Sequence, residues 1–360
     1  MATWLAPRGG QGGHGPALGG SQRPGDRSVM PDPAPAPPGP ARPMRSTEML
    51  DFDPEVMAMA VQHGVLEHVQ LERGVFRGRI AHTTAPASRI DWGSYALSVL
   101  ARGDLSPEMV SITLGLGGRG DWRVHGQTAT NGDMIVFPEG GEMLVALPPQ
   151  AQWLSLQVPR ARIEAAGLAL GRCLEGSARR MVGVIGDGLR QTLVDLAPVL
   201  APHAQSSAFD DAAVAIAHDE LLASLFGELA RRGGAIDSGA SLSPGERWRV
   251  IRRAEAYLES RADPSVRIDD LCVAACTSLS RLERAFRETF GVSPRRYLIL
   301  RRLAAVRREL LRGEPQTSVT NVATRWGFFH LGRFSQEYRE HFAERPSQTL
   351  RTQRAGSVPI

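Results

Sequence analysis

The 360-residue sequence has few cysteines and no long apolar run. Three cysteines, Cys173, Cys272 and Cys276, are too few for a disulfide framework. Cys272 and Cys276 have the spacing of half a metal site, but no His or Cys pair nearby completes it, so we expect structural thiols and no bound metal. No segment of about 18 consecutive apolar residues and no signal-peptide core is present, which predicts a cytoplasmic protein without a membrane partner.

Lysine is absent as well, because all 42 basic residues are arginine. Residues 246–354 contain 22 arginines and 13 acidic residues, a net charge of +9, whereas the whole chain carries +4. The rest of the chain is therefore net acidic. A basic excess confined to one region favours a surface that neutralises DNA phosphates, and the alternative is a set of solvated helix faces.

The same helix-rich unit occurs twice between residues 243 and 352. Five residues recur with an offset of 52: Leu282, Phe286, Phe290, Pro294 and Leu298 return as Phe334, Tyr338, Phe342, Pro346 and Leu350. A shorter apolar pattern precedes each copy: Ile268, Leu271 and Ala275, then Val319, Val322 and Trp326. A short helix, a tight turn and a longer helix make a helix-turn-helix, so the repeat predicts two of them.

Helix signals divide this region further. Ser243-Pro244-Gly245-Glu246 predicts a capping box with Ser243 as the N-cap. A connecting helix is expected from Arg295 to Arg312, because Ser293-Pro294 precedes it and Gly313 follows it. Each longer helix should bury one apolar stripe: Leu279, Leu282, Phe286 and Phe290 in the first, and Leu331, Phe334, Tyr338 and Phe342 in the second.

These motifs resemble a known family. Residues 281–287, followed by Gly291-Val292-Ser293-Pro294, are similar to the first DNA-binding unit of AraC/XylS-family transcriptional regulators. Trp326-Gly327-Phe328, Phe334 and Arg345-Pro346-Ser347 resemble the second unit. The resemblance implies binding to promoter DNA and activation through RNA polymerase. The alkylation-repair proteins that share this DNA-binding fold need a zinc-bound cysteine cluster, which this chain lacks. Cys276 and Ala343 stand where relatives commonly have glycine.

The resemblance assigns DNA-binding candidates by position. They are Ser280, Arg281, Glu283, Arg284 and Arg287 in the first unit, and Leu331, Gly332, Arg333, Ser335 and Gln336 in the second. Arg284 is the strongest candidate, because a guanidinium can bind O6 and N7 of guanine together. Gln336 suits adenine and Arg333 suits guanine or phosphate, while Gly332 has no side chain, which predicts a weakly specific second half-site. Glu283 either accepts from a cytosine amine or pairs with Arg287.

The N-terminal part has another character. Residues 1–45 are rich in Gly, Pro, Ala and Arg and should be a disordered tail, with Met44 and Met49 as alternative start positions. Residues 46–160 predict a mainly-β cupin-like barrel, with strands at 74–81, 94–100, 109–116, 134–137, 142–147 and 152–158. Gly132, Pro138 and Gly140 match the second cupin motif, Gly-x5-Pro-x-Gly.

The histidines that a catalytic cupin needs are missing. Met143 stands at one metal-ligand position, and His125 is followed by Gly126 and Gln127 where a His-x-His is required. We therefore expect no metal, no cofactor and no enzyme activity, and interpret His82 and His125 as ordinary sheet residues. An unknown small-molecule effector should bind in the barrel, near Trp92, Tyr95, Trp122, Arg123 and Phe137, unless these residues are merely core.

A helical region and a linker connect the two parts. Residues 161–232 contain two apolar stripes, Leu189, Leu193, Leu196 and Leu200, then Val214, Ala217, Leu221, Leu225 and Leu229. They predict helices that either pack on the barrel or form a homodimer. Residues 233–242 read as a linker, and residues 243–352 as an all-α tandem helix-turn-helix domain. Two alternatives to an effector-responsive activator remain: an enzyme with a degenerate cupin domain and an appended DNA-binding tail, and a constitutive regulator without a ligand.

Overall fold

A computed structural model describes residues 42–168, 178–181, 186–200, 211–231, 240–241, 245–261 and 266–356. Cys173, nearly all of the expected tail and most of the expected linker lie outside these ranges. Strand β1 (Arg42–Met49) begins inside the segment expected to be tail. Among the described helices, none combines the length and the apolar character needed to cross a membrane.

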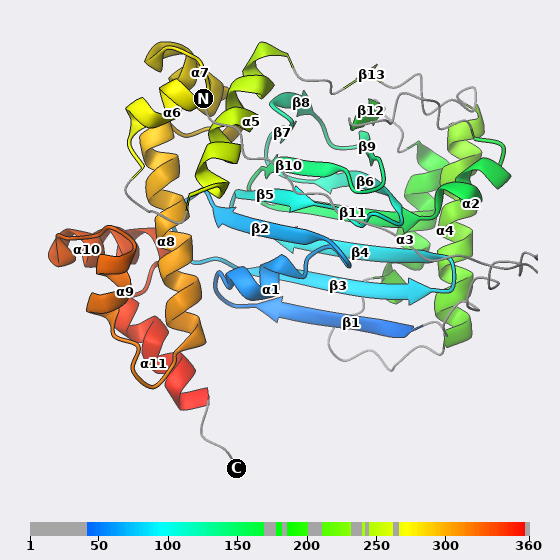
Figure 1. Cartoon of the computed structure of the whole chain (residues 1–360). Coiled ribbons are helices and arrows are strands. Elements are labelled where there is room, and N and C mark those ends of the chain that lie inside the picture. The colour runs from blue at the N-terminus through cyan, green and yellow to red at the C-terminus, as the bar shows by residue number, and fades with distance from the viewer. Residues whose placement is uncertain are drawn as a thin grey trace, which may run out of the picture. The chain divides into compact units, whose positions relative to one another are not determined.

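The N-terminal part is built from two antiparallel sheets (Figure 1). The first sheet has the order β1-β3-β4-β11-β6-β9-β12-β13, and the second has the order β2-β5-β10-β7-β8. Their further bounds are β2 Val65–Gln70, β3 Gly78–Ala85, β4 Ser88–Tyr95, β5 Val99–Asp104, β6 Val110–Gly117, β7 Trp122–Val124, β8 Gln127–Ala129, β9 Met134–Phe137, β10 Glu142–Leu147, β11 Ala151–Val158, β12 Arg179–Met181 and β13 Ala240–Ser241. The prediction of a mainly-β N-terminal domain is confirmed.

Most predicted strands are in place, but two are wrong. Strands β9 and β10 have the predicted bounds, and β6 and β11 differ from prediction by one residue. The predicted strand 74–81 is shifted relative to β3, and the predicted strand 94–100 spans the turn between β4 and β5. There, Tyr95, Leu97 and Val99 alternate like a strand, but residues 96–98 form the bend between β4 and β5.

Helices cover the outer face of the first sheet (Figure 1). They are α2 (Arg160–Ala165), α3 (Asp187–Leu200) and α4 (Asp211–Arg231), and a short helix α1 (Pro54–Ala58) precedes β2. Leu189 and Leu196 of α3 and Leu221 and Leu225 of α4 pack with sheet residues such as Leu156. The predicted apolar stripes therefore pack against the β domain, while their role in a homodimer stays a prediction.

The C-terminal part is all helical. Its elements are α5 (Glu246–Glu259), α6 (Ile268–Ala274), α7 (Leu279–Phe290), α8 (Pro294–Arg312), α9 (Val319–Arg325), α10 (Leu331–Phe342) and α11 (Pro346–Gly356). Helix α8 runs between the α6–α7 pair and the α9–α11 group, and it ends where predicted, at Gly313 with φ 58° (Figure 1). The N-cap of α5 is Gly245, where the chain is still extended, so the prediction that Ser243 is the N-cap is wrong. Ser243 itself lies outside the described residues.

Candidate DNA-binding interface and effector cavity

The first helix-turn-helix consists of α6 and α7. The turn between them passes through Cys276 at φ 49°, and the Ser278 hydroxyl then caps α7 by accepting from the Arg281 amide at 3.5 Å. Leu282 and Phe286 are fully buried. The helix ends at Gly291, whose φ is 74°. The short turn from Ala275 to Ser278 leaves the first residues of α7 exposed, as a groove-reading helix requires.

The second helix-turn-helix, α9 and α10, repeats this geometry. Gly327 at φ 78° makes the turn, and Ala343 at φ 59° ends α10. Phe334, Tyr338 and Phe342 form the buried stripe. Both departures from the glycine pattern, Cys276 and Ala343, therefore sit at left-handed backbone positions that favour glycine.

Two residues of the predicted stripes are not buried. Leu279 is 45% exposed and Leu331 is 37% exposed. Each is the first residue of its helix, where the side chain lies over the preceding turn rather than over the core. Phe329, just before α10, is 75% exposed. Its neighbour Phe328 instead packs against Phe334, with ring centroids 4.9 Å apart.

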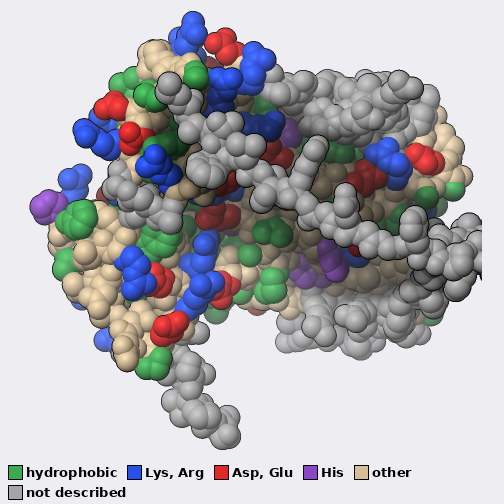
Figure 2. Space-filling view, in the orientation of Figure 1, with side chains coloured by type: hydrophobic (Ala, Val, Ile, Leu, Met, Phe, Trp, Pro, Cys, Tyr) green, Lys and Arg blue, Asp and Glu red, His purple; other side chains and the backbone are tan. Residues whose placement is uncertain are grey.

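Most of the predicted DNA-binding residues are exposed. Ser280, Arg281, Arg284, Arg287, Leu331, Gly332, Arg333 and Gln336 are exposed, and Glu283 and Ser335 are half-buried. Figure 2 shows blue side chains gathered over the end of the helical region where α6 and α7 lie. The candidates thus remain accessible on the surface of the two longer helices.

Intramolecular partners divide these candidates into two groups. Arg281 Nη1 lies 3.1 Å from a Glu246 carboxylate oxygen, and Arg287 Nη2 lies 3.8 Å from Glu283. Gln336 Nε2 donates to Glu340 at 2.9 Å. Within the described parts of the chain, Arg284 and Arg333 have neither an ion pair nor a side-chain hydrogen bond. Because their guanidinium groups are exposed and uncommitted, these two arginines can approach DNA without first losing a partner.

Comparison with known proteins agrees with this geometry. Residues 271–352 match a helix-turn-helix domain family. A probable thc operon regulatory protein of Rhodococcus erythropolis is 36% identical over 104 residues, and the XylDLEGF operon transcriptional activator 3 of Pseudomonas putida is 35% identical over 104 residues. The C-terminal domain belongs to the AraC/XylS family. Each match covers 31% of the relative's own length and less than a third of this chain, so this chain spans about a third of the relatives that it matches.

A solved structure is also similar to a part of this chain. The probable AraC family transcriptional regulator of Rhodopseudomonas palustris CGA009 is 32% identical, with a TM-score of 0.28, and the match covers 29% of this chain and 96% of that one.

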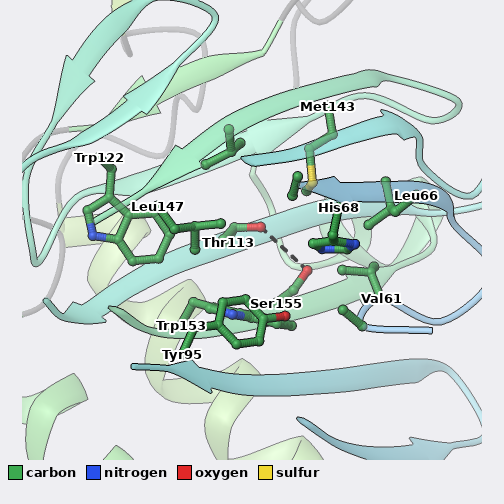
Figure 3. A pocket seen from close by; sticks show the side chains of 13 residues that line it. Val61, Leu66, His68, Tyr95, Thr113, Trp122, Met143, Leu147, Trp153 and Ser155 are labelled. Carbon is green, nitrogen blue, oxygen red and sulfur yellow. Dashed lines mark hydrogen bonds between the residues drawn. The ribbon is translucent and has the colours of Figure 1, made fainter. Parts of the chain in front are cut away.

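A cavity lies between the two sheets of the β domain (Figure 3). Most of its walls are apolar, with Leu66, Ala101, Trp122, Met143 and Leu147 among them. Polar groups come from His68, Tyr95, Thr113, Trp153 and Ser155. Its volume is about 30 Å³, which is room for one or two water molecules. A larger molecule would have to push the walls apart.

The cavity walls carry no charge at neutral pH. Burial lowers the pKa of His68 to about 4, although Glu67 opposes this, so the imidazole is neutral. Burial raises the pKa of Tyr95 far above its usual value, and the nearby Trp153 indole only partly offsets that rise. Among the described residues, His68 Nδ1, the Tyr95 hydroxyl and Trp153 Nε1 are buried without a hydrogen bond of ordinary geometry. These atoms can recognise the polar group of an uncharged molecule.

The predicted ligand residues are only partly at this cavity. Tyr95 and Trp122 line it. Phe137 is buried in the surrounding core, and Trp92 packs toward the α3–α4 side. Arg123 instead donates to the Glu288 carbonyl of α7 at 2.6 Å, because its place in β7 directs it outward. Trp92, Phe137 and Arg123 therefore do not line this cavity.

The histidines have structural partners. His82 Nδ1 lies 2.8 Å from Asp91, inside the first sheet. His125 has φ 51° in the turn after β7, not in a strand, and its ring stacks on Trp248 of α5 at 4.5 Å. In the described ranges no group of three or more His, Cys, Asp or Glu side chains is placed to hold a metal ion.

The second sheet is shared by the cavity and the AraC/XylS domain. Successive strand residues point to opposite faces. In β10, Val145 lines the cavity, whereas its neighbours Leu144 and Ala146 pack with Ile251 of α5 and Phe286 of α7. The same alternation holds in β2 and β5, where His68 and Ala101 face the cavity and Val69 and Leu100 face the helices. One layer of backbone therefore separates the cavity from the helices of the first DNA-binding unit.

Buried ion pairs strengthen this contact. Arg102 of β5 pairs with Glu255 of α5 and with Glu67 of β2. Arg308 of α8 lies 3.1 Å from Glu67, and Arg301 of α8 lies 3.7 Å from Glu255. Burial alone would raise the pKa of Glu67, but these arginines, with Arg102 foremost, lower it to about 2. Glu67 therefore stays ionised at physiological pH.

The second DNA-binding unit is held in the same way. Arg307 of α8 is fully buried; it donates to the Phe52 carbonyl and pairs with Glu344, which follows α10. The His341 carbonyl near the end of α10 accepts from the Gly74 amide at 3.0 Å. The β domain therefore touches the C-terminal ends of both longer helices, α7 through Arg123 and α10 through Gly74.

Proposed function

We propose that this protein is a cytoplasmic, non-enzymatic transcriptional regulator that binds promoter DNA through its AraC/XylS domain and activates transcription in response to a small molecule. The observation that carries the proposal is the pair of helix-turn-helix units whose exposed longer helices present the uncommitted arginines Arg284 and Arg333. Two recognition helices on a common rod, α8, can enter successive major-groove segments about 34 Å or ~10 base pairs apart.

Effector control is supported by the shared sheet. The cavity is too small for an effector as it stands, so binding would displace part of its walls, and β2, β5 and β10 form the wall next to the helices. These strands pack directly on α5, α7 and α8. Displacement would therefore change how the β domain holds the two recognition helices, and with it the affinity for DNA. Because the walls are uncharged, the effector should be a compact, uncharged and largely apolar molecule with one hydrogen-bonding group.

RNA polymerase and a second copy of this chain are further partners of the proposed activator. The polymerase is suggested by relatives that bear the name transcriptional activator. A homodimer would have to use surfaces of α3 and α4 other than the stripes packed on the sheet. Both follow from the likeness to the family rather than from a contact in this chain.

Genome-wide DNA occupancy of the full-length protein tests the proposal, with Arg284→Ala beside the wild type. We expect discrete sites with two short motifs about one helical turn, ~10 base pairs, apart, which the variant no longer occupies. Diffuse occupancy that is unchanged in the variant would refute sequence-specific regulation. A matched variant, Arg79→Ala, lies on β3 away from the AraC/XylS domain and should leave occupancy unchanged.

A further inference from the structure

The start of the second recognition helix carries an unusual apolar edge. Phe329 is 75% exposed and Leu331 is 37% exposed, with the N-cap His330 between them. Next in the chain, Gly332 has open space around it, since a Cβ there would meet no atom within 4 Å. In the free protein, the apolar ring of Phe329 stays in contact with water instead of being buried, which is unfavourable. A partner that covers the ring would recover that burial.

The position of this edge indicates which partner covers it. The N-terminal end of the second helix of a helix-turn-helix is the end that contacts base edges in the major groove. Arg333, four residues after Phe329 in the sequence, is exposed and has no intramolecular partner among the described residues. The apolar edge is therefore continuous with the proposed DNA-reading surface.

Two residues of α10 that lie near this edge offer little hydrogen bonding to bases. Gln336, which suits adenine, already donates to Glu340 at 2.9 Å. Gly332 offers no side chain. The major groove exposes one apolar group, the C5 methyl of thymine, and apolar side chains including phenylalanine contact it.

We infer that Phe329 and Leu331 read thymine methyl groups in the half-site bound by the second unit. This inference rests on the proposed function, because it needs sequence-specific binding. The equivalent of Phe329 in the first unit, 52 residues earlier, is Thr277, so the two half-sites are read by different chemistry. The first half-site depends on the guanidinium of Arg284, and the second gains specificity from apolar contact.

Removal of single methyl groups from DNA tests the inference. A site for the full-length protein is first selected from random duplexes; failure to enrich any sequence would count against the proposed function itself. Each thymine of the selected site is then replaced by deoxyuridine, which lacks only the C5 methyl. We expect one or two replacements in the second half-site to weaken binding about fourfold each, the contribution of one buried methyl group.

The same replacements are measured on Phe329→Ala and Leu331→Ala. Each variant should bind the thymine site more weakly and lose the effect of one replacement, while Thr277→Ala retains all of them. Both side chains are exposed, so the melting temperatures should not change. The inference is overturned if no deoxyuridine matters, or if its effect persists in both variants. It is equally overturned if the variants keep full DNA affinity but fail to activate transcription, because the edge would then contact RNA polymerase.

Discussion

Arg102 of β5 and Glu255 of α5 form an ion pair in which the two side chains are 8% and 7% exposed. Their positions are 153 residues apart in the sequence, and the pair joins the β domain to the DNA-binding region. Burial lowers the pKa of Arg102, but the surrounding carboxylates, Glu255 first among them, raise it. The net effect is a raised pKa. Arg102 therefore stays charged in the folded protein.

Loss of Arg102 should destabilise the protein strongly. Arg102→Met removes the arginine that pairs with both Glu67 and Glu255. We therefore expect the free energy of unfolding to fall by about 3–5 kcal/mol. The matched control is Arg79→Met, which breaks the more exposed pair with Glu48 and should cost at most about 1 kcal/mol. Denaturant unfolding of the full chain measures both. Similar losses in the two variants would show that the buried pair has no special weight.

Arg284 should contribute to base recognition rather than to general attraction. We expect Arg284→Ala to weaken binding to a selected site by about 1–3 kcal/mol and to relax one base position. Arg284→Lys keeps the charge but cannot form the bidentate contact, so it should lose nearly as much. Fluorescence anisotropy at several salt concentrations measures both variants. If lysine restores full affinity, Arg284 is a phosphate contact.

Glycine should stabilise the two strained turns. Cys276 at φ 49° and Ala343 at φ 59° occupy backbone conformations that disfavour a Cβ. Cys276→Gly and Ala343→Gly should each raise the free energy of unfolding by about 0.5–1 kcal/mol, after the greater flexibility of glycine in the unfolded chain is subtracted. The reciprocal change, Gly327→Ala at φ 78°, should lower it. Unfolding that is insensitive to all three changes would mean that the turns relax without strain.

Mild acid should destabilise the fold through buried histidines. Burial lowers the pKa of His68 and His218 from 6.5 to about 4, and that of His341 to about 3. The unfolded chain therefore binds more protons than the folded chain between those values, so stability falls as pH drops from 6.5 toward 4. Each such histidine contributes a slope of up to about 1.4 kcal/mol per pH unit.

His218→Gln provides the control for this pH dependence. The His218 ring lies 2.6 Å from Thr83 Oγ1 and 2.8 Å from Ser88 Oγ, and a glutamine amide can replace one of these contacts without titrating. The variant should be less stable at pH 7 but should lose less stability on acidification. An unchanged slope in unfolding experiments between pH 6.5 and 4 would contradict the assignment.

An effector should be detectable by its charge preference. We expect some uncharged alcohols, amides or nitriles to raise the melting temperature of the full-length protein, while their carboxylate counterparts do not. A ligand at 100 times its dissociation constant adds about 2.7 kcal/mol. Ala101→Val fills part of the cavity and should abolish the effect. Stabilisation by carboxylates only, or stabilisation that survives in Ala101→Val, would refute the proposed site.

Much of the AraC/XylS domain was predictable because its signals are local. The repeat from Leu282 to Leu350 located both longer helices, and Gly313 marked the end of α8 where the structure has it. Cys276, which stands where relatives commonly have glycine, has a positive φ in the structure. In the β domain, by contrast, alternation could not separate strand from turn around Tyr95, so β5 was misplaced.

The sequence by itself determined the periodic features: apolar stripes at helical spacing, the offset of 52 residues and the arginine excess that favours DNA. The tertiary structure alone decided which side chains meet across long separations. It brought Arg102 to Glu255, turned Arg123 toward α7 and left Leu279 and Phe329 exposed at the helix starts. The physical reason is that periodicity reports only which face of an element is apolar. What covers that face depends on how the elements pack, and packing is set by the whole chain at once.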